Sequence, residues 1–320
     1  RGNTVSNSFF EVDFDSNMNI SRLLHKASGR TVAPEGEVLN KIIAYEDRPY
    51  NHDAWNVDVY FDEKALEVTD VTGSELVENG PVRAVWKVVR KFMSSTIEQY
   101  FIFYKAIDRI DVQYIADWKE KNILLKADYP VDVNAVRATF DIQFGNLERT
   151  THNNTMWDYA QFEVVGHKWA DLSDNSFGLA ILNDCKYGWT VKQGHIIPSL
   201  LRCATTPNHA QDREVHHFTY SIYPHTGAAN SSDVVKHGYS LNFPLYCKKA
   251  EPGEGKLGTC YSFVSADAPN VIIETVKKAE DSKDIVIRAY ETWNKKTRCV
   301  LTFGENIKSA VECNLMEEDE

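Results

Sequence analysis

The chain has 320 residues, of which 43% are hydrophobic and 25% are charged, and its formal net charge is −11. This size and composition predict a large buried core in one large or two smaller domains, which excludes a disordered polypeptide. The negative charge disfavours nucleic acid or an anionic membrane as the main partner, and no apolar run is long enough for a membrane-spanning helix.

Alternation of apolar and polar residues predicts β-strands along almost the whole chain. The alternating runs are rich in aromatic and β-branched residues, and turn residues separate them. In chain order the predicted strands are 9–14, 57–61, 84–89, 98–107, 110–118, 140–144, 217–223 and 285–289. No segment shows a capped helical period; 270–279 is the best helix candidate, and its VIIETV run suits a strand equally well.

Many strands without intervening helices predict an all-β fold of antiparallel sheets stacked face to face. The segment 248–258, KKAEPGEGKLG, is charged and rich in Gly and Pro, which is typical of a linker. We therefore predict a large domain over 1–250 and a smaller one over 251–320.

Four motifs follow one another at characteristic separations: HKWADLS (167–173), GLAILNDCKYGW (178–189), SLLRCATTP (199–207) and HHFTYSIYPH (216–225). They resemble the C-terminal region of the class II α-mannosidases, glycoside hydrolase family 38, most closely the neutral cytosolic animal type. The resemblance extends over nearly the whole chain through DRPYNHDAWNVDVY (47–60), FDIQFGNLERTTHNNTMWD (140–158), VVKHGYSLNFPL (234–245) and NVIIETVKKAED (270–281).

The chain departs from the family pattern at several positions. The Trp-Asp-Ala-Trp-Asp segment of the family reads His52-Asp53-Ala54-Trp55-Asn56 here, so the departures affect the contacts around His52 and Asn56. Thr150 replaces the proline expected after Arg149, and Cys203 replaces the alanine expected after Arg202.

The resemblance implies a galactose-mutarotase-like supersandwich followed by a smaller β-sandwich. It further implies that the parent protein is a retaining, zinc-dependent (or cobalt-dependent) α-mannosidase that removes terminal mannose from free oligosaccharides in the cytoplasm. In the family the two catalytic carboxylates and the metal ligands lie in an N-terminal barrel, no motif of which occurs here. We therefore expect this segment to be inactive alone, to bind no metal, and to support the missing catalytic domain while closing its sugar pocket.

Arg202 is the first candidate for a substrate contact, because it matches the family arginine that reaches the substrate region from this domain. A guanidinium donates to two sugar hydroxyls or orients a carboxylate of the barrel. The alternative is a structural ion pair.

Asn183, Asp184 and Tyr187 are further candidates, since an apolar strand (179–182) runs directly into them. Their amide and carboxylate groups match vicinal sugar hydroxyls, and a Tyr ring stacks on a sugar face. The alternative is a turn whose side chains hold its own backbone.

Asp53 and Trp55 form a third candidate, in which the indole is a platform for a pyranose ring. The alternative is a Trp that fills the sandwich core. Arg149, together with Asn153 and Trp157, forms another candidate loop with the same alternative.

Other patterns point away from metal and disulfide sites. Asp13 and Asp15 mimic the start of a calcium loop, but Met18 and Leu24 stand where such a loop needs Gly and Glu, so a hairpin turn is predicted. The six irregularly spaced cysteines predict free, packed thiols, which favours the cytoplasm.

Two other functions compete with a mannosidase region. A stand-alone carbohydrate-binding or aldose-epimerase-like module would need a His acid and a Glu base in one pocket, and His167 and Glu163 are candidates if one strand carries both. The acidic, aromatic-rich surface also suggests a contact between subunits of a homo-oligomer.

Overall fold

The structure, a computed structural model, describes residues 3–251, 253, 255 and 258–318. Its described elements are almost all β-strands, which confirms the all-β prediction. The chain divides into two units: the first contains the chain up to Ile142 and Leu147–Pro244, and the second contains Gln143–Asn146 and the chain from Leu245 onward. Part of the predicted linker, 248–258, lies outside the described residues, and the rest of it forms no helix or strand.

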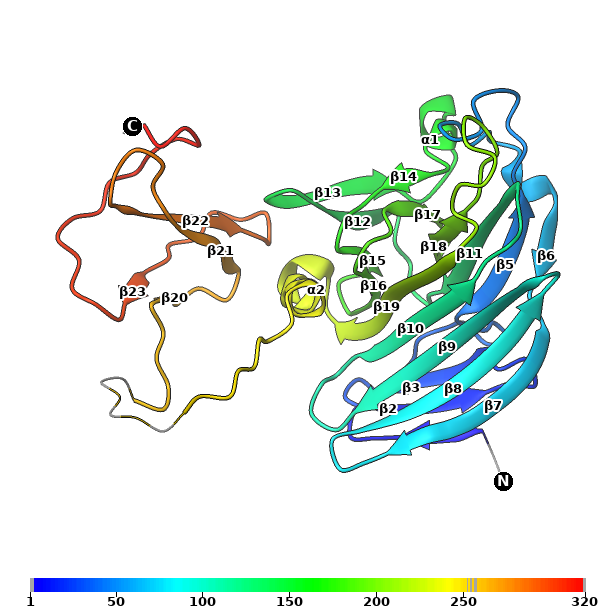
Figure 1. Ribbon diagram of the computed structural model, residues 1–320, viewed down its shortest axis with the longest axis horizontal. Helices are drawn as coiled ribbons and strands as arrows, with labels where there is room; N and C mark the ends of the chain where they lie inside the picture. Colours follow the sequence, from blue (N-terminus) through cyan, green and yellow to red (C-terminus); the bar gives the residue numbers. More distant parts are fainter. Residues whose placement is uncertain (1–2, 252, 254, 256–257, 319–320) are drawn as a thin grey trace. The chain divides into compact units, whose positions relative to one another are not determined.

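Three antiparallel sheets build the first unit (Figure 1). In order of pairing, the four-stranded sheet contains β1 (Thr4–Ser6), β2 (Phe10–Phe14), β3 (Ile20–His25) and β4 (Arg30–Thr31). The six-stranded sheet contains β14 (Val164–Val165), β17 (Gly188–Lys192), β18 (His195–Arg202), β11 (Ile123–Pro130), β5 (Lys41–Glu46) and β6 (Ala65–Glu67). The nine-stranded sheet contains β13 (Gly145–Thr150), β12 (Arg137–Ile142), β15 (Trp169–Ser173), β16 (Phe177–Asn183), β19 (Val215–Thr226), β10 (Ile110–Asp117), β9 (Ser95–Tyr104), β8 (Arg83–Phe92) and β7 (Asp70–Asn79).

One contiguous apolar core draws side chains from all three sheets. Its largest fully buried members include Trp118 and Trp189, together with Tyr114 and Tyr220, whose rings lie edge to face. Alternate apolar residues of the predicted strands in the first unit, such as Val112, Tyr114 and Ala116 of β10, face this core, as expected for sheets that each bury one face.

The second unit is smaller and discontinuous in sequence. Its described strands form two antiparallel pairs: β20 (Val264–Ala266) with β23 (Leu301–Phe303), and β21 (Val271–Lys278) with β22 (Ile285–Glu291). The segment Gln143–Asn146 belongs to it, since Phe144 packs edge to face on Tyr290 and the Asn146 side chain donates to the Thr292 carbonyl at 2.8 Å. The ambiguous stretch 270–279 is therefore mostly strand, as β21.

Two α-helices lie where no helix was predicted. Helix α1 (Met156–Ala160) begins with a capping box between Thr155 and Asp158. Helix α2 (Val234–Asn242) covers β15 and β16, so closely that a side chain at Gly238 would meet the indole of Trp169 at 2.9 Å. No helix in the described part of the chain is long and apolar enough to cross a membrane.

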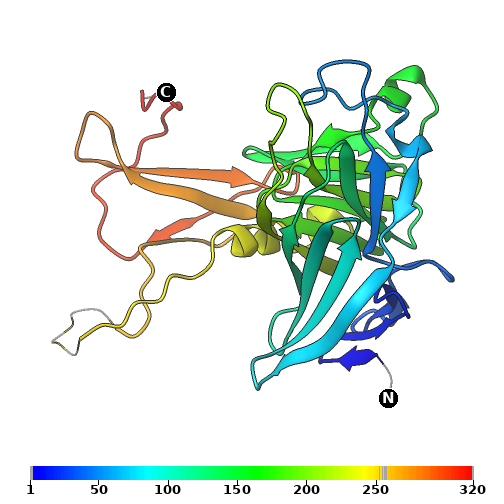
Figure 2. The same ribbon diagram turned by 45° about the vertical axis from the view of Figure 1, so that its right-hand side comes forward.

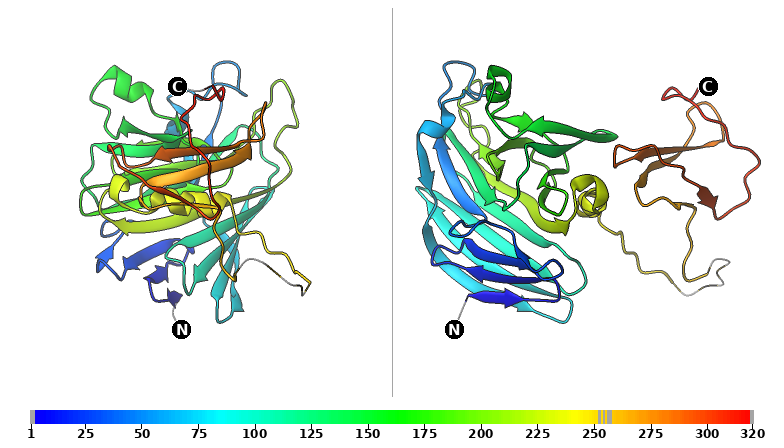
Figure 3. Two further views of the ribbon diagram at one scale, coloured as in Figure 1. Left: turned by 90° about the vertical axis from the view of Figure 1, so that its left-hand side faces the viewer. Right: turned by 180° about the vertical axis from the view of Figure 1, so that it is seen from behind.

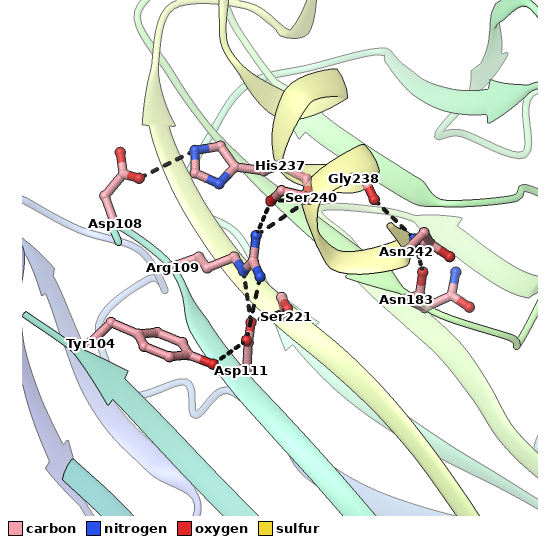
Figure 4. A network of polar contacts seen from close by, with 10 residues as sticks. All are labelled: Tyr104, Asp108, Arg109, Asp111, Asn183, Ser221, His237, Gly238, Ser240 and Asn242. Atoms are coloured by element: carbon pink, nitrogen blue, oxygen red, sulfur yellow. Dashed lines mark hydrogen bonds and ion pairs between the residues drawn. The ribbon is translucent and has the colours of Figure 1, made fainter. Parts of the chain in front are cut away.

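Polar contacts fix α2 on the sheet (Figure 4). The Arg109 guanidinium donates to the Asp111 carboxylate on β10 at 2.8 Å and to the Ser240 hydroxyl on α2 at 2.5 Å. Asp108 pairs with His237 at 3.2 Å, and this pairing lowers the pKa of Asp108 despite its partial burial. Helix α2 is thus held by Asp108 and Arg109, which lie between β9 and β10.

Two sequence predictions on local structure are wrong. Residues 57–61 are not a strand: the Asp58 carboxylate accepts from the Tyr50 N–H at 2.7 Å and from the Tyr60 hydroxyl at 2.5 Å, which favours a turn, and a 3₁₀ turn (Phe61–Glu63) follows. The six cysteines are free, as predicted, but only Cys203 is buried; Cys185, Cys247, Cys260 and Cys313 are exposed. The predicted hairpin turn after β2 is confirmed.

A fully buried arginine joins separate sheets. Arg90 on β8 donates to the Gln99 side chain on β9 at 2.8 Å, and to the Asn17 and Met18 carbonyls at 2.6 and 3.0 Å. Those carbonyls belong to the β2–β3 turn of the four-stranded sheet. Arg90 has no carboxylate within ion-pair distance among the described residues, and burial lowers its pKa.

A buried ion pair lies on the face of the six-stranded sheet that the 3₁₀ turn covers. Lys126 on β11 donates to Glu163, which also accepts from the Ser199 hydroxyl at 2.6 Å. The Phe61 ring lies over the Lys126 ammonium, 5.3 Å away. Glycine at 188 makes room for this pair, because a Cβ there would lie 2.5 Å from the Glu163 carboxylate.

A second ion pair in this sheet predicts a pH-dependent stability. His195 contacts the Asp128 carboxylate at 2.8 Å, and this hydrogen bond raises the pKa of the imidazole despite its partial burial. Its stabilisation is therefore complete below the unfolded-state pKa of about 6.5 and is lost as the pH rises through the higher folded-state pKa. We expect His195→Gln to lower the free energy of unfolding by about 1 kcal/mol at pH 5.5 and by less at pH 8.5.

Urea titrations at the two pH values measure this difference. The matched control is His209→Gln, an exposed histidine with no ion pair among the described residues, for which no pH-dependent gap is expected. An equal loss of stability for His195→Gln at both pH values would contradict the prediction.

Candidate functional site

Three loop segments gather on one side of the first unit: 47–64, 203–214, and 151–163 with α1. They lie together at the same side in every view (Figure 1, Figure 2 and Figure 3). Ring contacts agree, since Phe61 of the first segment packs on Phe162 of the third at 6.1 Å. Several predicted site residues lie on or beside these loops.

Arg202 is the last residue of β18 and is held by the loop that follows β5. Its Nε donates to Asp47 Oδ2 at 2.5 Å and its Nη2 to Asp47 Oδ1 at 3.2 Å; Nη2 also donates to the Asn56 carbonyl. Asp47 is 1% exposed and Arg202 is 20% exposed. The ion pair that we gave as the alternative is therefore present, and it leaves part of the guanidinium at the surface.

Asp53 ties the same loop to the segment after β18. Its carboxylate accepts from the Thr205 N–H at 2.6 Å, the Thr205 hydroxyl at 2.8 Å and the Thr206 N–H at 3.1 Å. These hydrogen bonds, above all that of the Thr205 N–H, lower the pKa of Asp53. Asp53 therefore orders the loop, and both of its oxygens are engaged.

Trp55 lies between these two connections and points away from the core. It is 69% exposed, so the alternative of a Trp that fills the sandwich core is wrong. The left-handed conformation of His52 (φ 56°) allows its carbonyl to accept from the N–H groups of Trp55 and Asn56 at 2.8 and 2.9 Å. The departure from the family pattern at Asn56 has little consequence here, since Asn56 contacts Arg202 through its backbone.

Asn183 holds its own turn, as the alternative interpretation had it. Its side chain donates to the His167 carbonyl and accepts from the Lys186 N–H, both at 2.5 Å, and the residue is buried. Asn242 of α2 donates to the Asn183 carbonyl at 2.9 Å, as Figure 4 shows. Because Asn183 is buried and its polar atoms are engaged in these contacts, a ligand cannot reach its side chain.

Asp184 and Tyr187 follow in the same turn, at the end of the six-stranded sheet where β17 begins and β18 ends. The Tyr187 ring is half exposed and stacks on His167, with 5.0 Å between ring centroids. One oxygen of Asp184 is buried and has no hydrogen-bond partner among the described residues. Of the three predicted residues in this turn, Tyr187 is thus the most accessible to a ligand.

Arg149 lies apart, on β13 at the edge of the nine-stranded sheet. Its guanidinium lies 4.7 Å from the centre of the Phe140 ring, and burial lowers its pKa. Of its two companions, Asn153 is exposed and Trp157 on α1 is 85% exposed. The structure therefore brings Arg202, Asp53 and Trp55 together but does not add Arg149 to them.

The pairing needed for an epimerase is contradicted. Glu163 and His167 do not share a strand, because β14 covers only Val164–Val165 and β15 begins at Trp169. The Glu163 carboxylate is paired with Lys126 and also accepts from the hydroxyls of Thr190 and Ser199, so it is engaged and not available as a base. The described part of the chain also holds no group of three or more His, Cys, Asp or Glu that could bind a metal ion.

Sequence reasoning missed the residues that position Arg202. Asp47 lies within the quoted motif DRPYNHDAWNVDVY, directly after β5, but nothing in the sequence singles it out from the other 45 acidic residues. Thr205 and Thr206 were likewise not identified. Their proximity to Asp53 follows from the topology, in which the ends of β5 and β18 flank the same end of β11.

Two family models match the chain. Residues 5–210 match the "Glycosyl hydrolases family 38 C-terminal domain", and residues 270–320 match the "Glycosyl hydrolases family 38 C-terminal beta sandwich domain". Together they cover parts of both units.

Similar proteins are named α-mannosidases. The chain is 39% identical to Alpha-mannosidase G of Dictyostelium discoideum and 36% identical to the human Alpha-mannosidase 2C1, over 98% of this chain in both cases. It spans only 30% of the length of each. The solved structure of an α-mannosidase from Enterococcus faecalis has the same fold, with a TM-score of 0.85 at 16% identity, over 100% of this chain and 40% of that one.

Proposed function

Because this chain belongs to the C-terminal domain family of the family 38 glycosyl hydrolases, we propose that it closes the sugar pocket of an α-mannosidase. The reaction is removal of terminal α-linked mannose with retention of configuration. The substrates are free oligosaccharides, so the parent protein acts in oligosaccharide catabolism and mannose metabolism.

The catalytic machinery belongs to the remainder of the parent protein. A retaining hydrolase needs two carboxyl groups about 5 Å apart across the glycosidic bond, and zinc or cobalt would need a cluster of ligands. The length of the relatives supports their location elsewhere, because Alpha-mannosidase G is more than three times as long as this chain. The principal partner of the chain is therefore its own N-terminal catalytic domain.

The observation that carries the pocket role is that the loop bearing the exposed Trp55 also holds Arg202, at the end of β18, through Asp47 and the Asn56 carbonyl. An indole face packs on the C–H side of a pyranose, and a guanidinium donates to its hydroxyls. The sequence therefore supplies both halves of a sugar contact on a rigid support. Tyr187 is the next candidate, and Arg149 is a more distant one.

We place the parent protein in the cytoplasm. Support comes from the six free cysteines, four of them exposed, which an oxidising compartment would tend to pair. The homo-oligomer suggested by the sequence stays a prediction that light scattering of the parent protein tests.

Hydrolysis of an aryl α-mannoside tests the proposed function. We expect no turnover by this chain with zinc or cobalt added, and metal-dependent turnover by the full-length protein. In the full-length protein, Arg202→Ala is expected to lower kcat/KM about 10- to 100-fold, the effect of losing a charged hydrogen bond. The control Arg83→Ala removes an exposed arginine paired with Glu78 and should leave kcat/KM unchanged.

The outcomes separate the parts of the proposal. Metal-dependent turnover by this chain alone would contradict the division of roles between the two parts of the parent protein. Wild-type kcat/KM for full-length Arg202→Ala would contradict the pocket role while leaving the family assignment intact.

A further inference from the structure

Asp47 is a buried carboxylate with a single side-chain partner among the described residues. That partner is Arg202, which it binds through both oxygens. The backbone of Asp47 is itself fixed, because its N–H donates to the Asn122 carbonyl at 2.7 Å just before β11. A carboxylate placed in this way sets the direction of the guanidinium.

The hydrogen bonds that Arg202 makes to Asp47 and Asn56 determine which of its N–H groups remain free to bind a ligand. A guanidinium has five N–H donors. The Nε–Nη2 edge, the fork that grips carboxylates and phosphates side-on, is bound to Asp47, and the second Nη2 hydrogen serves the Asn56 carbonyl. Only Nη1 has no partner in the described part of the chain, so a ligand meets the two hydrogens of one nitrogen.

The charges around Arg202 act against an anionic ligand. Besides Asp47, Asp53 and Asp58 stand on the same loop: Asp53 accepts from the Thr205 N–H, three residues after Arg202, and Asp58 lies two residues after Asn56, whose carbonyl Arg202 contacts. The guanidinium of Arg202 thus shares its loop surroundings with three carboxylates. A neutral hydroxyl oxygen is the acceptor that suits such surroundings.

We propose that Asp47 is the positioning residue of Arg202, which confines its donors to Nη1 and cancels its charge, so that the pocket accepts neutral mannosyl hydroxyls and rejects phosphorylated sugars. The inference rests on the proposed pocket role of Arg202 and adds a specificity to it.

The test uses the full-length enzyme and two readouts: kcat/KM for an aryl α-mannoside and the inhibition constant of mannose 6-phosphate. Asp47→Asn keeps the shape of the side chain but removes its charge. We expect kcat/KM to fall about tenfold and inhibition by mannose 6-phosphate to strengthen about tenfold, because the guanidinium is then uncompensated. Glu46→Gln, one residue away and paired with exposed Arg48 and Lys64, is the matched control and should change neither value.

A double variant distinguishes an effect that Asp47 exerts through Arg202 from general misfolding of the Asp47→Asn enzyme. If Asp47 acts through Arg202, adding Asp47→Asn to Arg202→Ala lowers kcat/KM no further. An additional tenfold loss in the double variant overturns the inference, as does unchanged inhibition by mannose 6-phosphate in a folded Asp47→Asn enzyme. Wild-type kcat/KM for Arg202→Ala instead defeats the pocket role itself, so the two failures are distinguishable.

Discussion

Replacing Arg90 with alanine is expected to lower the free energy of unfolding by about 4 kcal/mol or more. Arg90 is fully buried, and its donors serve backbone carbonyls of Asn17 and Met18 and the side chain of Gln99. Truncation leaves these acceptors without their donor and opens a cavity beside them. Since the contacts join β8 and β9 to the β2–β3 turn, the four-stranded sheet should loosen first.

Urea unfolding followed by tryptophan fluorescence measures the loss. Arg90→Lys should recover only part of it, because an ammonium has three donors and lacks the planar fork of the guanidinium. The control Arg83→Ala removes an exposed arginine with a surface partner and should cost no more than about 1 kcal/mol. A loss below about 1 kcal/mol for Arg90→Ala would show that water or backbone shifts replace its hydrogen bonds.

Replacing Glu163 with alanine should cost about 3–5 kcal/mol at neutral pH, since it leaves the ammonium of Lys126 buried without a counter-charge. Burial already lowers the pKa of Lys126, and Glu163 opposes that shift. Without Glu163 the pKa of Lys126 falls further, so the folded state holds the lysine proton less tightly than the unfolded state does. When the folded-state pKa of a lysine lies below its unfolded-state pKa, the folded protein loses stability at low pH, where the lysine is charged in both states. This loss of unfolding free energy becomes smaller as the pH rises toward the unfolded-state pKa of about 10.4.

Two comparisons make this prediction specific. The stability gap between wild type and Glu163→Ala should be smaller at pH 9.5 than at pH 7. The double variant Lys126→Met with Glu163→Leu should be close to wild type, because it removes both charges and keeps the volume. A pH-independent gap, or a double variant as unstable as the single one, would contradict the role given to the buried charge.

The long strands could be predicted from sequence because their period-2 pattern reports burial on one face. β8, β9, β10 and β19 follow it directly. The prediction failed at 57–61, where the pattern is equally good, because the Asp58 carboxylate captures nearby hydrogen-bond donors and stabilises a turn. Helix α1 is too short to show a helical period, although its capping box, Thr155 to Asp158, was legible in the sequence.

The candidate site was predictable only in part. The resemblance identified Arg202 and Trp55, and residue types alone suggested the 183–187 turn. Neither could show that Asn183 is buried or that Trp55 is exposed, because burial depends on which segments the fold brings over a residue. The partner of Arg202 lies 155 positions away in sequence, and only the pairing of β5 and β18 with β11 brings the two side chains together.

The second unit is assembled from two stretches of chain separated by about a hundred residues: Gln143–Asn146, and the chain from Leu245 onward. A gene fragment that starts near residue 245 therefore lacks the partners of Tyr290 and Thr292, namely Phe144 and Asn146. Recombination near residue 245 therefore does not transfer the whole second unit. Exchange of the small unit between relatives should therefore succeed only when Gln143–Asn146 and the chain from Leu245 onward come from one parent.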